Sequence, residues 1–259
     1  MTNVTEQMNN HRRLGSGPYL ALLLIVYLLT LVGCSQKIEP MPDLAAITDV
    51  NLMKQTFYDY LTPIARQQNS IIEQQRTLVS EWRDTLASGD ELGWLARRRL
   101  NTLANTYEIA DLEETADIVD ELWLRVDIIP VQLTLAQAAI ESGWGRSRFA
   151  VDHNNLFGQW CYQPGCGVIP KRRPEGMKHE VASFESVSES VRRYMNNLNT
   201  HPRYAHLRQL RAQARQAQRP VTASLLTPGL LGYSERGEVY VEEVATMIRR
   251  NESLVPKRG

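Results

Sequence analysis

The chain has 259 residues, 43% of them hydrophobic, and its 29 Lys and Arg balance its 29 Asp and Glu. This length allows one ordinary domain with an additional region, or two small domains. A formal net charge of zero argues against a nucleic-acid-binding protein held by a strongly positive surface. Three Cys and five His scattered along the chain exclude a zinc-finger framework, and 15 Gly with 12 Pro exclude a collagen-like chain.

Residues 1–33 are typical of a bacterial lipoprotein signal peptide. An apolar run of 14 residues, from Tyr19 to Val32, follows Arg12 and Arg13. The run is shorter than the roughly 20 residues that a membrane-spanning helix needs, and it has the length of a signal-peptide core. It leads into the sequence LVGC, ending at Cys34, which resembles the motif that precedes a lipid-modified Cys.

We therefore predict that Cys34 carries lipid and that the chain is a periplasmic, lipid-anchored protein. Several acyl chains would hold it firmly at a membrane, since a single chain anchors only marginally. Ser35 rather than Asp follows the Cys, which is typical of lipoproteins sorted to the outer membrane. The alternative interpretation is a plain N-terminal membrane anchor with an incidental Cys.

The rest of the chain divides into a tether over residues 34–47, a helical N-terminal region over 48–127 and a second domain over 128–252. In the N-terminal region, the spacing of apolar residues predicts helices over 49–61, 62–88, 91–109 and 111–123.

Local signals mark where these helices begin. Pro63 would open the second helix, because Pro is favoured at the first helical position. Asp111 and Glu114 have the spacing of a capping box at the start of the fourth. Three Trp, at positions 82, 94 and 123, are expected in the core, and the N-terminal region contains no pattern typical of catalysis.

The second domain combines helices with a turn-rich patch. A helix opens at Pro130 and stops at Ser142-Gly143. Between residues 151 and 184, Gly and Pro interrupt short apolar runs, which predicts a β-hairpin rather than a helix. Ser186 and Glu189 form a further capping box, and helices are expected to resume over 204–218 and 234–250.

Cys161 and Cys166 flank the turn sequence YQPG within this patch. In the oxidising periplasm, such a closely spaced pair is expected to form a local disulfide. A metal site is the alternative, but His153 and His179 do not have a recognisable ligand spacing with the pair.

Glu141 is the candidate catalytic residue. It occupies the last turn of the helix that stops at Gly143, where the negative end of the helix dipole disfavours a carboxylate. Ile140 and Trp144 could also remove it from water. Both effects raise the pKa of a carboxyl group, as a general acid working near neutral pH requires. For Glu141 alone, a solvated helix-end carboxylate would be the simpler interpretation.

The surrounding motifs favour the catalytic interpretation. AQAAIESGWGRS (136–147), DHNNLFGQW (152–160) and GYSERGEVYVEEV (232–244) resemble, in this order, the bacterial N-acetylglucosaminidases of glycoside hydrolase family 73. The Cys pair and the sequence NTHPRY (199–204) look most like the Bax-type branch of that family. The resemblance covers about half of the chain and implies a mainly α, lysozyme-like domain with a small β-hairpin lobe.

The resemblance also implies roles for individual residues. Glu141 matches the general acid, and Tyr233 matches a Tyr opposite the acid that contacts the reacting sugar. The segment that lines the groove matches Asn155, Leu156, Phe157 and Gly158. The family's second carboxylate lies in the hairpin, where this sequence departs from the pattern; Glu175 is the first choice and Glu180 the fallback. Either could equally be a solvated hairpin charge.

The implied reaction is hydrolysis of β-1,4 glycosidic bonds next to N-acetylglucosamine in peptidoglycan, without a metal or organic cofactor. Trp144, Trp160 and Tyr162 are candidates for stacking on sugar rings, although Trp144 could simply pack in the fold. Peptidoglycan and a membrane are the expected partners, nucleic acid is not, and no protein partner is indicated. The alternatives are a muramidase or lytic transglycosylase, and a wall-binding lipoprotein without catalysis.

Four Arg, at positions 208, 211, 215 and 219, recur at helical spacing and share one face. A solvated face is the favoured interpretation. The alternative is a surface for the anionic peptides of peptidoglycan or for lipid phosphates.

Overall fold

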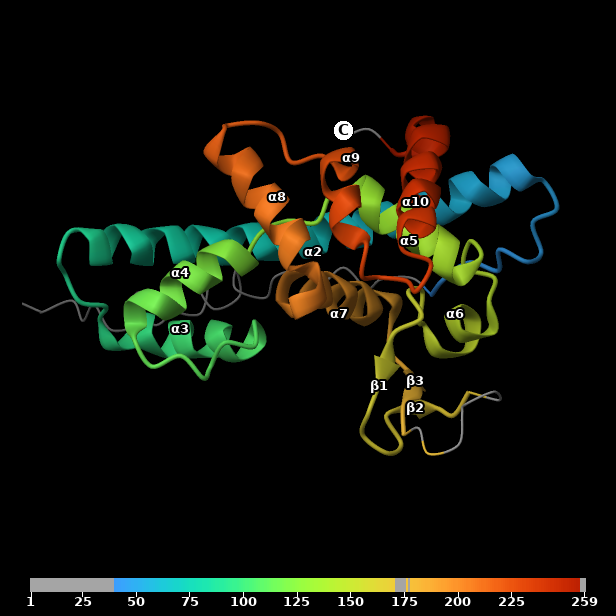
Figure 1. Ribbon diagram of the computed structural model, residues 1–259. Coiled ribbons are helices and arrows are strands. Elements are labelled where there is room, and N and C mark those ends of the chain that lie inside the picture. The colour runs from blue at the N-terminus through green and yellow to red at the C-terminus, as the bar shows by residue number, and fades with distance from the viewer. Residues whose placement is uncertain (1–39, 171–175, 177, 257–259) are drawn as a thin grey trace, which may run out of the picture. The chain divides into compact units, whose positions relative to one another are not determined.

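A computed structural model describes residues 40–170, 176 and 178–256. These described residues form one compact unit (Figure 1). The predicted signal peptide 1–33, the lipid attachment site Cys34 and the candidate carboxylate Glu175 all lie outside the described residues. Within the described ranges, no helix combines the length and the apolar character needed to cross a membrane.

Helix α2 (Val50–Ala87) runs through the unit and contacts α4, α5 and α7. The predicted break at Thr62–Pro63 is wrong, since α2 continues through Pro63 as one helix of 38 residues. An interior Pro costs a helix about 3 kcal/mol. The buried side chains of α2 continue on both sides of the Pro, and their packing offsets this cost; they include Phe57, Leu61, Ile64, Ile72 and Val79.

Helices α3 (Trp94–Thr106) and α4 (Thr115–Arg125) complete the N-terminal region. The predicted capping box is wrong, because α4 begins after Glu114 and, within the described part of the chain, no side chain caps it. Trp82 is buried as expected, but Trp94 is 72% exposed. It is the first residue of α3, whose buried face is formed further along by Leu100 and Leu103.

Helix α5 (Val131–Ser142) is confirmed with its predicted ends, and Gly143 closes it in the left-handed conformation with φ 57°. Eight of its twelve residues are buried, because it lies against both α2 and α10. A short helix, α6 (Arg148–His153), follows that the sequence pattern did not predict. The side chain of Ser147 caps it by accepting a hydrogen bond from the backbone N–H of Ala150.

The β lobe consists of strands β1 (Trp160–Cys161), β2 (Gly167–Val168) and β3 (Glu180–Ala182). They form one antiparallel sheet in the order β1-β3-β2, which Figure 1 shows as a lobe projecting from the helices. The predicted β-hairpin is confirmed by the antiparallel pairing of β2 with β3, in which Gly167 lies opposite Ala182. Strand β1 was not predicted, since its two residues are too few to show an alternating pattern.

Helix α7 (Val187–Thr200) starts at the predicted capping box, where Ser186 accepts a hydrogen bond from the backbone N–H of Glu189. The remaining elements are η1 (Pro202–Tyr204), α8 (Ala205–Gln216), α9 (Ala223–Leu226), η2 (Thr227–Leu230), α10 (Glu238–Asn251) and η3 (Glu252–Leu254). The predicted class, mainly α with a small β lobe, is confirmed.

The predicted solvated arginine face of α8 is wrong for two of its four members. Arg211 is 1% exposed and Arg208 is 4% exposed. Arg211 donates to five oxygen atoms, including the backbone carbonyls of Leu124 and Asp127. Helical spacing identified the shared face correctly, but this face packs on the end of α4 and the connection to α5.

Candidate active site

Glu141 lies in the last turn of α5 and is partly buried. Its Oε1 accepts a hydrogen bond of 2.8 Å from the phenolic hydroxyl of Tyr240 on α10. The position of the carboxyl group is therefore fixed by two helices that contact each other, one carrying the acid and the other its hydrogen-bond donor.

The environment of Glu141 raises the pKa of its carboxyl group above the ordinary value. Burial is the largest cause, because it penalises the charged form. The hydrogen bond from Tyr240 and the charge of Arg236 oppose this effect, while the charge of Glu243 adds to it. Arg236 and Glu243 form an ion pair of 2.6 Å with each other. The two charges therefore act on the pKa of Glu141 in opposite directions from neighbouring positions. The direction agrees with what a general acid requires.

The loop between α6 and β1 faces the other carboxylate oxygen. A Cβ atom built on Gly158 would lie 3.8 Å from Oε2 of Glu141, and Gly158 has a φ of 63°, which favours glycine. Asn155 holds this loop: its amide donates to the carbonyls of Gln159 and Ala182, and its Oδ1 accepts from the backbone N–H of Gln159. The loop is thereby tied to strand β3.

The predicted groove residues Asn155, Leu156 and Phe157 are buried, with exposures of 1%, 0% and 3%. The Phe157 ring stacks on Tyr194 with centroids 3.9 Å apart. These buried side chains therefore support the loop from the protein interior. Gly158 is the member of the predicted segment that approaches Glu141.

Tyr233 lies in the same site. Its ring stacks on that of Tyr240, with centroids 5.3 Å apart and planes at 3°, and its hydroxyl donates to the carbonyl of Phe157 at 3.3 Å. Burial raises the pKa of Tyr233 well above the ordinary value, so its hydroxyl stays protonated. Tyr233 thus connects the donor of Glu141 with the loop that carries Gly158.

Trp144 packs against α2. Its ring stacks on Tyr58 at 5.5 Å and meets Phe57 edge-on at 5.9 Å, with the Lys54 ammonium 5.0 Å from its centre. These contacts favour the packing interpretation of Trp144. Its neighbour Gly145 is equally constrained, because a Cβ there would lie 2.7 Å from Leu44.

Trp160 and Tyr162 remain candidates for sugar contacts, with exposures of 55% and 71%. The Trp160 ring stacks on His179 with centroids 4.2 Å apart, which holds the indole in a defined orientation. The predicted disulfide between Cys161 and Cys166 is present next to it.

Glu180, the fallback for the second carboxylate, is 7% exposed. Its two carboxylate oxygens accept hydrogen bonds from the backbone N–H groups of Gly165 and Gly167 at 3.1 and 2.9 Å. It therefore holds the loop closed by the disulfide. Its oxygens also lie near the sulfurs of Cys161 and Cys166, but disulfide-bonded sulfurs do not act as thiolate ligands for a metal.

Three residues of the site carried no predicted role. Tyr240, Arg236 and Glu243 all belong to or adjoin α10, within the motif that contains Tyr233. Tyr240 follows Tyr233 by seven positions, a spacing that places two residues on one helical face. The spacing therefore suggested that Tyr233 and Tyr240 lie close together. However, Tyr233 precedes α10, so the two residues do not share a face of that helix.

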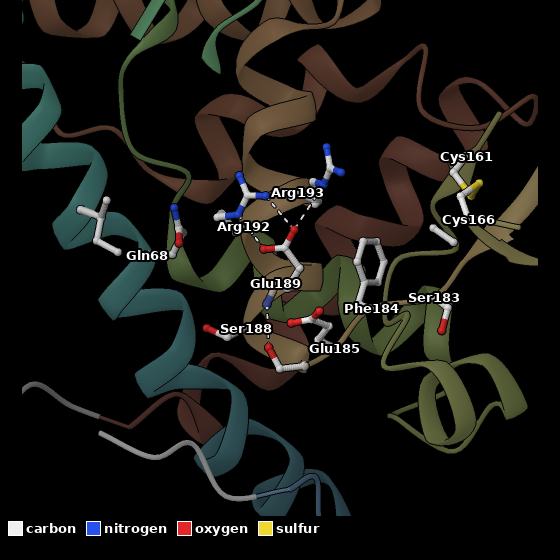
Figure 2. Close-up of a pocket in the computed structure, with 13 residues that line it drawn as sticks. Gln68, Cys161, Cys166, Ser183, Phe184, Glu185, Ser188, Glu189, Arg192 and Arg193 are labelled. Carbon is white, nitrogen blue, oxygen red and sulfur yellow. Dashed lines mark hydrogen bonds and ion pairs between the residues drawn. A yellow bond between two sulfur atoms is a disulfide. The ribbon is translucent and has the colours of Figure 1, made fainter. Parts of the chain in front are cut away.

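A cavity of 660 Å³ lies between α2, the start of α7 and the β lobe (Figure 2). It is lined by the disulfide, Gln68, and an ion-paired cluster in which Glu189 accepts from Arg192. The residues that line it do not include Glu141.

Residues 116–253 match the family described as mannosyl-glycoprotein endo-beta-N-acetylglucosaminidase. The chain is also 36% identical, over 223 residues, to protein bax of Escherichia coli strain K12, an alignment that covers 85% of this chain and 78% of that protein. The chain belongs to the glucosaminidase family. The matched residues of this glucosaminidase-family chain include Glu141, Tyr233 and Tyr240.

Among solved structures, the catalytic domain of the autolysin Auto from Listeria monocytogenes aligns with a TM-score of 0.37 and 20% sequence identity. That alignment covers 71% of this chain and 95% of the autolysin domain. Glucosaminidase-family membership rests on the sequence matches alone and places the chain among glycosidases.

Proposed function

We propose that the chain is an endo-β-N-acetylglucosaminidase that hydrolyses β-1,4 glycosidic bonds in peptidoglycan. The observation that carries this proposal is the partly buried Glu141, whose pKa is raised by burial and whose Oε1 is held by Tyr240. Family membership supports the same reaction class.

In the proposed reaction, Glu141 acts as general acid. It gives its proton to the glycosidic oxygen as the bond to the anomeric carbon breaks, and the sugar develops oxocarbenium character. The leaving oxygen departs as a hydroxyl, and water completes the hydrolysis. Tyr240 then donates to a full carboxylate, and a hydrogen bond to a charged acceptor is stronger than one to a neutral acceptor.

The second group of the reaction is either Glu175 or the 2-acetamido group of the substrate. Glu175 would activate water or stabilise the cation, whereas the acetamido oxygen would attack the anomeric carbon directly. Glu180 is the weaker candidate, since both of its oxygens accept hydrogen bonds from the backbone of the disulfide loop.

Trp160 and Tyr162 are proposed as the sugar-stacking side chains, because both are exposed. Trp160 is also held by His179. An aromatic ring held in place in this way can pack on the apolar face of a sugar without a large loss of side-chain entropy.

We propose that the enzyme is attached to the outer membrane, facing the periplasm, through lipid on Cys34. The lipobox-like sequence that ends at Cys34 supports this location. Metabolic labelling with palmitate followed by membrane fractionation tests it. Label and membrane association should both disappear in Cys34→Ser, and label retained by that variant would contradict the proposal.

The test of activity compares wild type, Glu141→Gln and Glu113→Gln on purified peptidoglycan, with products identified by mass spectrometry. Glu113 is an exposed carboxyl outside the site and serves as the control. Removing a general acid typically costs about 100- to 10,000-fold in rate. Wild type and Glu113→Gln should release fragments with reducing-end N-acetylglucosamine, and Glu141→Gln should not.

The same products separate the alternatives. Anhydro-muramic ends would identify a lytic transglycosylase, and reducing-end muramic acid would identify a muramidase. Binding to peptidoglycan without any release of fragments would identify a wall-binding lipoprotein. Equal activity of wild type and Glu141→Gln would contradict the role of Glu141.

A further inference from the structure

A buried amide lies directly behind the donor of Glu141. Gln137 is 0% exposed and precedes Glu141 by four positions on α5, so the two side chains share a face of the helix. Its Nε2 donates to the hydroxyl oxygen of Tyr240 at 2.9 Å, and its Oε1 accepts from the hydroxyl of Tyr194 at 2.6 Å. Tyr194 on α7 and Tyr240 on α10 are each 1% exposed.

The three hydrogen bonds form a chain in which each group donates to the next, from Tyr194 through Gln137 and Tyr240 to Glu141. A phenolic hydroxyl has a single proton and so donates a single hydrogen bond, whereas an amide oxygen can only accept. Tyr194 donates its proton to the amide oxygen of Gln137, which turns the amide nitrogen toward Tyr240. Because Tyr240 accepts from that nitrogen, its own proton is directed to Oε1 of Glu141.

The direction decides which oxygen of a neutral Glu141 carries the proton. The carbonyl oxygen of a carboxylic acid is a stronger acceptor than its hydroxyl oxygen, so a hydrogen bond donated by Tyr240 to Oε1 favours the proton at the other oxygen. That oxygen, Oε2, faces Gly158, where a side chain would come within 3.8 Å. With the amide of Gln137 reversed, Tyr240 would accept from Glu141, and the acidic proton would point into the protein.

We propose that Gln137 is a positioning residue that, through Tyr240, keeps the acidic proton of Glu141 on Oε2. The inference rests on the proposed function. In the reaction, the O–H bond at Oε2 breaks, an O–H bond forms at the glycosidic oxygen, and the electron pair of the breaking glycosidic bond goes to that oxygen. Water then bonds through its oxygen to the anomeric carbon and returns one proton to the carboxylate of Glu141.

The other groups that influence Glu141 do not provide this direction. Arg236 and Glu243, the charged residues whose fields act on it, form an ion pair with each other and have opposite effects on its pKa. Burial, with a contribution from the charge of Glu141, keeps Tyr240 protonated by raising its pKa, so it remains a donor when Glu141 is ionised. Only the Gln137 amide orients that donor among the described contacts of Tyr240.

The test uses the full chain with Gln137→Met, which removes the amide, and Gln137→Glu, which has nearly the same shape. When the new carboxyl of Gln137→Glu is ionised, it accepts from both Tyr194 and Tyr240 and draws the Tyr240 proton away from Glu141. When it is neutral, it can donate to Tyr240 and accept from Tyr194, as the amide does. Activity of Gln137→Glu should therefore recover as the pH falls.

Both variants should lower kcat by about 10- to 100-fold while KM stays within about twofold, because proton delivery and not binding is affected. Thr62→Val is the matched control for loss of a buried polar group. Its hydroxyl is buried in α2 and has no hydrogen-bond partner among the described residues. It should retain wild-type kcat and pH profile.

A second readout does not depend on activity. In ¹³C NMR titrations, the carboxyl group of Glu141 should titrate at higher pH in Gln137→Glu than in wild type, since it loses the donor that favours its charged form. Folding is checked by thermal unfolding. If neither Gln137 variant folds, Tyr194→Phe replaces them: a lower kcat at unchanged KM supports the inference, and a wild-type kcat overturns it.

Folded Gln137 variants with wild-type kcat and an unchanged titration of Glu141 would overturn the inference while leaving the proposed function intact. If instead wild type releases no fragments from peptidoglycan, the proposed function fails. The titration of Glu141 then decides the inference alone: a shift in Gln137→Glu supports the directed hydrogen bonds, and no shift excludes them.

Discussion

The hydroxyl of Tyr240 lies 2.8 Å from Oε1 of Glu141 and donates to it, so the acid and its donor are joined across α5 and α10. This bond favours the ionised form of Glu141, whereas burial favours the neutral form and is the larger effect. The surroundings of the carboxyl group thus favour its neutral form, and a donor is in place for the charge that appears when it gives up its proton.

Tyr240→Phe should raise the pKa of Glu141 further, because it removes a bond that lowers that pKa. The acid is active in its protonated form, so the alkaline limb of the pH–rate profile should move to higher pH. The maximal rate should fall by about 10-fold or more, since the carboxylate loses its stabilising donor. An alkaline limb that moves to lower pH would contradict this account of the bond.

Gly158→Ala should reduce activity by about 10-fold or more, because the added methyl group would stand in front of Oε2 of Glu141. The φ of 63° at Gly158 also makes the substitution destabilising by about 1 kcal/mol. Gly89→Ala controls for this strain, since Gly89 has a φ of 84° and nothing within 4 Å of a new Cβ. Similar losses of activity in both variants would show that strain, and not obstruction of Glu141, is the cause.

Glu175→Gln and Glu180→Gln should have different consequences. If Glu175 is the second catalytic group, its variant should lose about 100-fold or more in kcat while unfolding like wild type. Glu180→Gln should lose about 1–3 kcal/mol of stability, because Glu180 holds Gly165 and Gly167 of the disulfide loop. Rates and urea unfolding measured on both variants separate the two roles. Wild-type kcat in Glu175→Gln would favour attack by the acetamido group of the substrate.

Asp127→Asn should destabilise the fold by about 3–5 kcal/mol, because it leaves the buried Arg211 without its carboxylate partner. Arg215 pairs with the same carboxylate at 2.7 Å, and Arg76 approaches it at 3.5 Å. Urea unfolding at neutral pH measures the effect. A loss below about 1 kcal/mol, as is usual for an exposed pair, would contradict the burial of this cluster.

The pH dependence of this loss follows from the pKa of Asp127. Burial would raise that pKa, but the hydrogen bond from Arg215 and the charges of Arg211 and Arg76 together lower it below the ordinary value. A carboxyl group with a lowered pKa in the folded state stabilises the fold above its unfolded pKa and loses this effect as pH falls through its folded pKa. The difference between wild type and Asp127→Asn should therefore shrink in acid.

The sequence was informative where local chemistry decides the structure. Gly143 ends α5 in a left-handed conformation, and Ser186 caps α7, as their positions predict. The pattern around Glu141 placed the acid at a helix end and predicted a raised pKa, and burial in the structure raises its pKa in the same direction. These features depend on residues within a few positions of one another.

Features that depend on distant residues were not predictable. Whether an arginine face meets solvent or backbone carbonyls depends on the segment opposite it, as the burial of Arg211 against Asp127 shows. Pro63 does not break α2, because packing on both sides outweighs its local preference. Tyr240 reaches Glu141 from 99 positions away, so no local spacing relates them.

The most direct test of the central claim is the titration of Glu141 itself in the wild-type chain. In ¹³C NMR with labelled Glu, the resonance missing from Glu141→Gln identifies the residue. We predict that this carboxyl group titrates clearly above the ordinary Glu value of about 4.3, together with the alkaline limb of peptidoglycan hydrolysis. Titration at or below that value would mean that Glu141 is ionised at neutral pH, and the account of it as a general acid would be wrong.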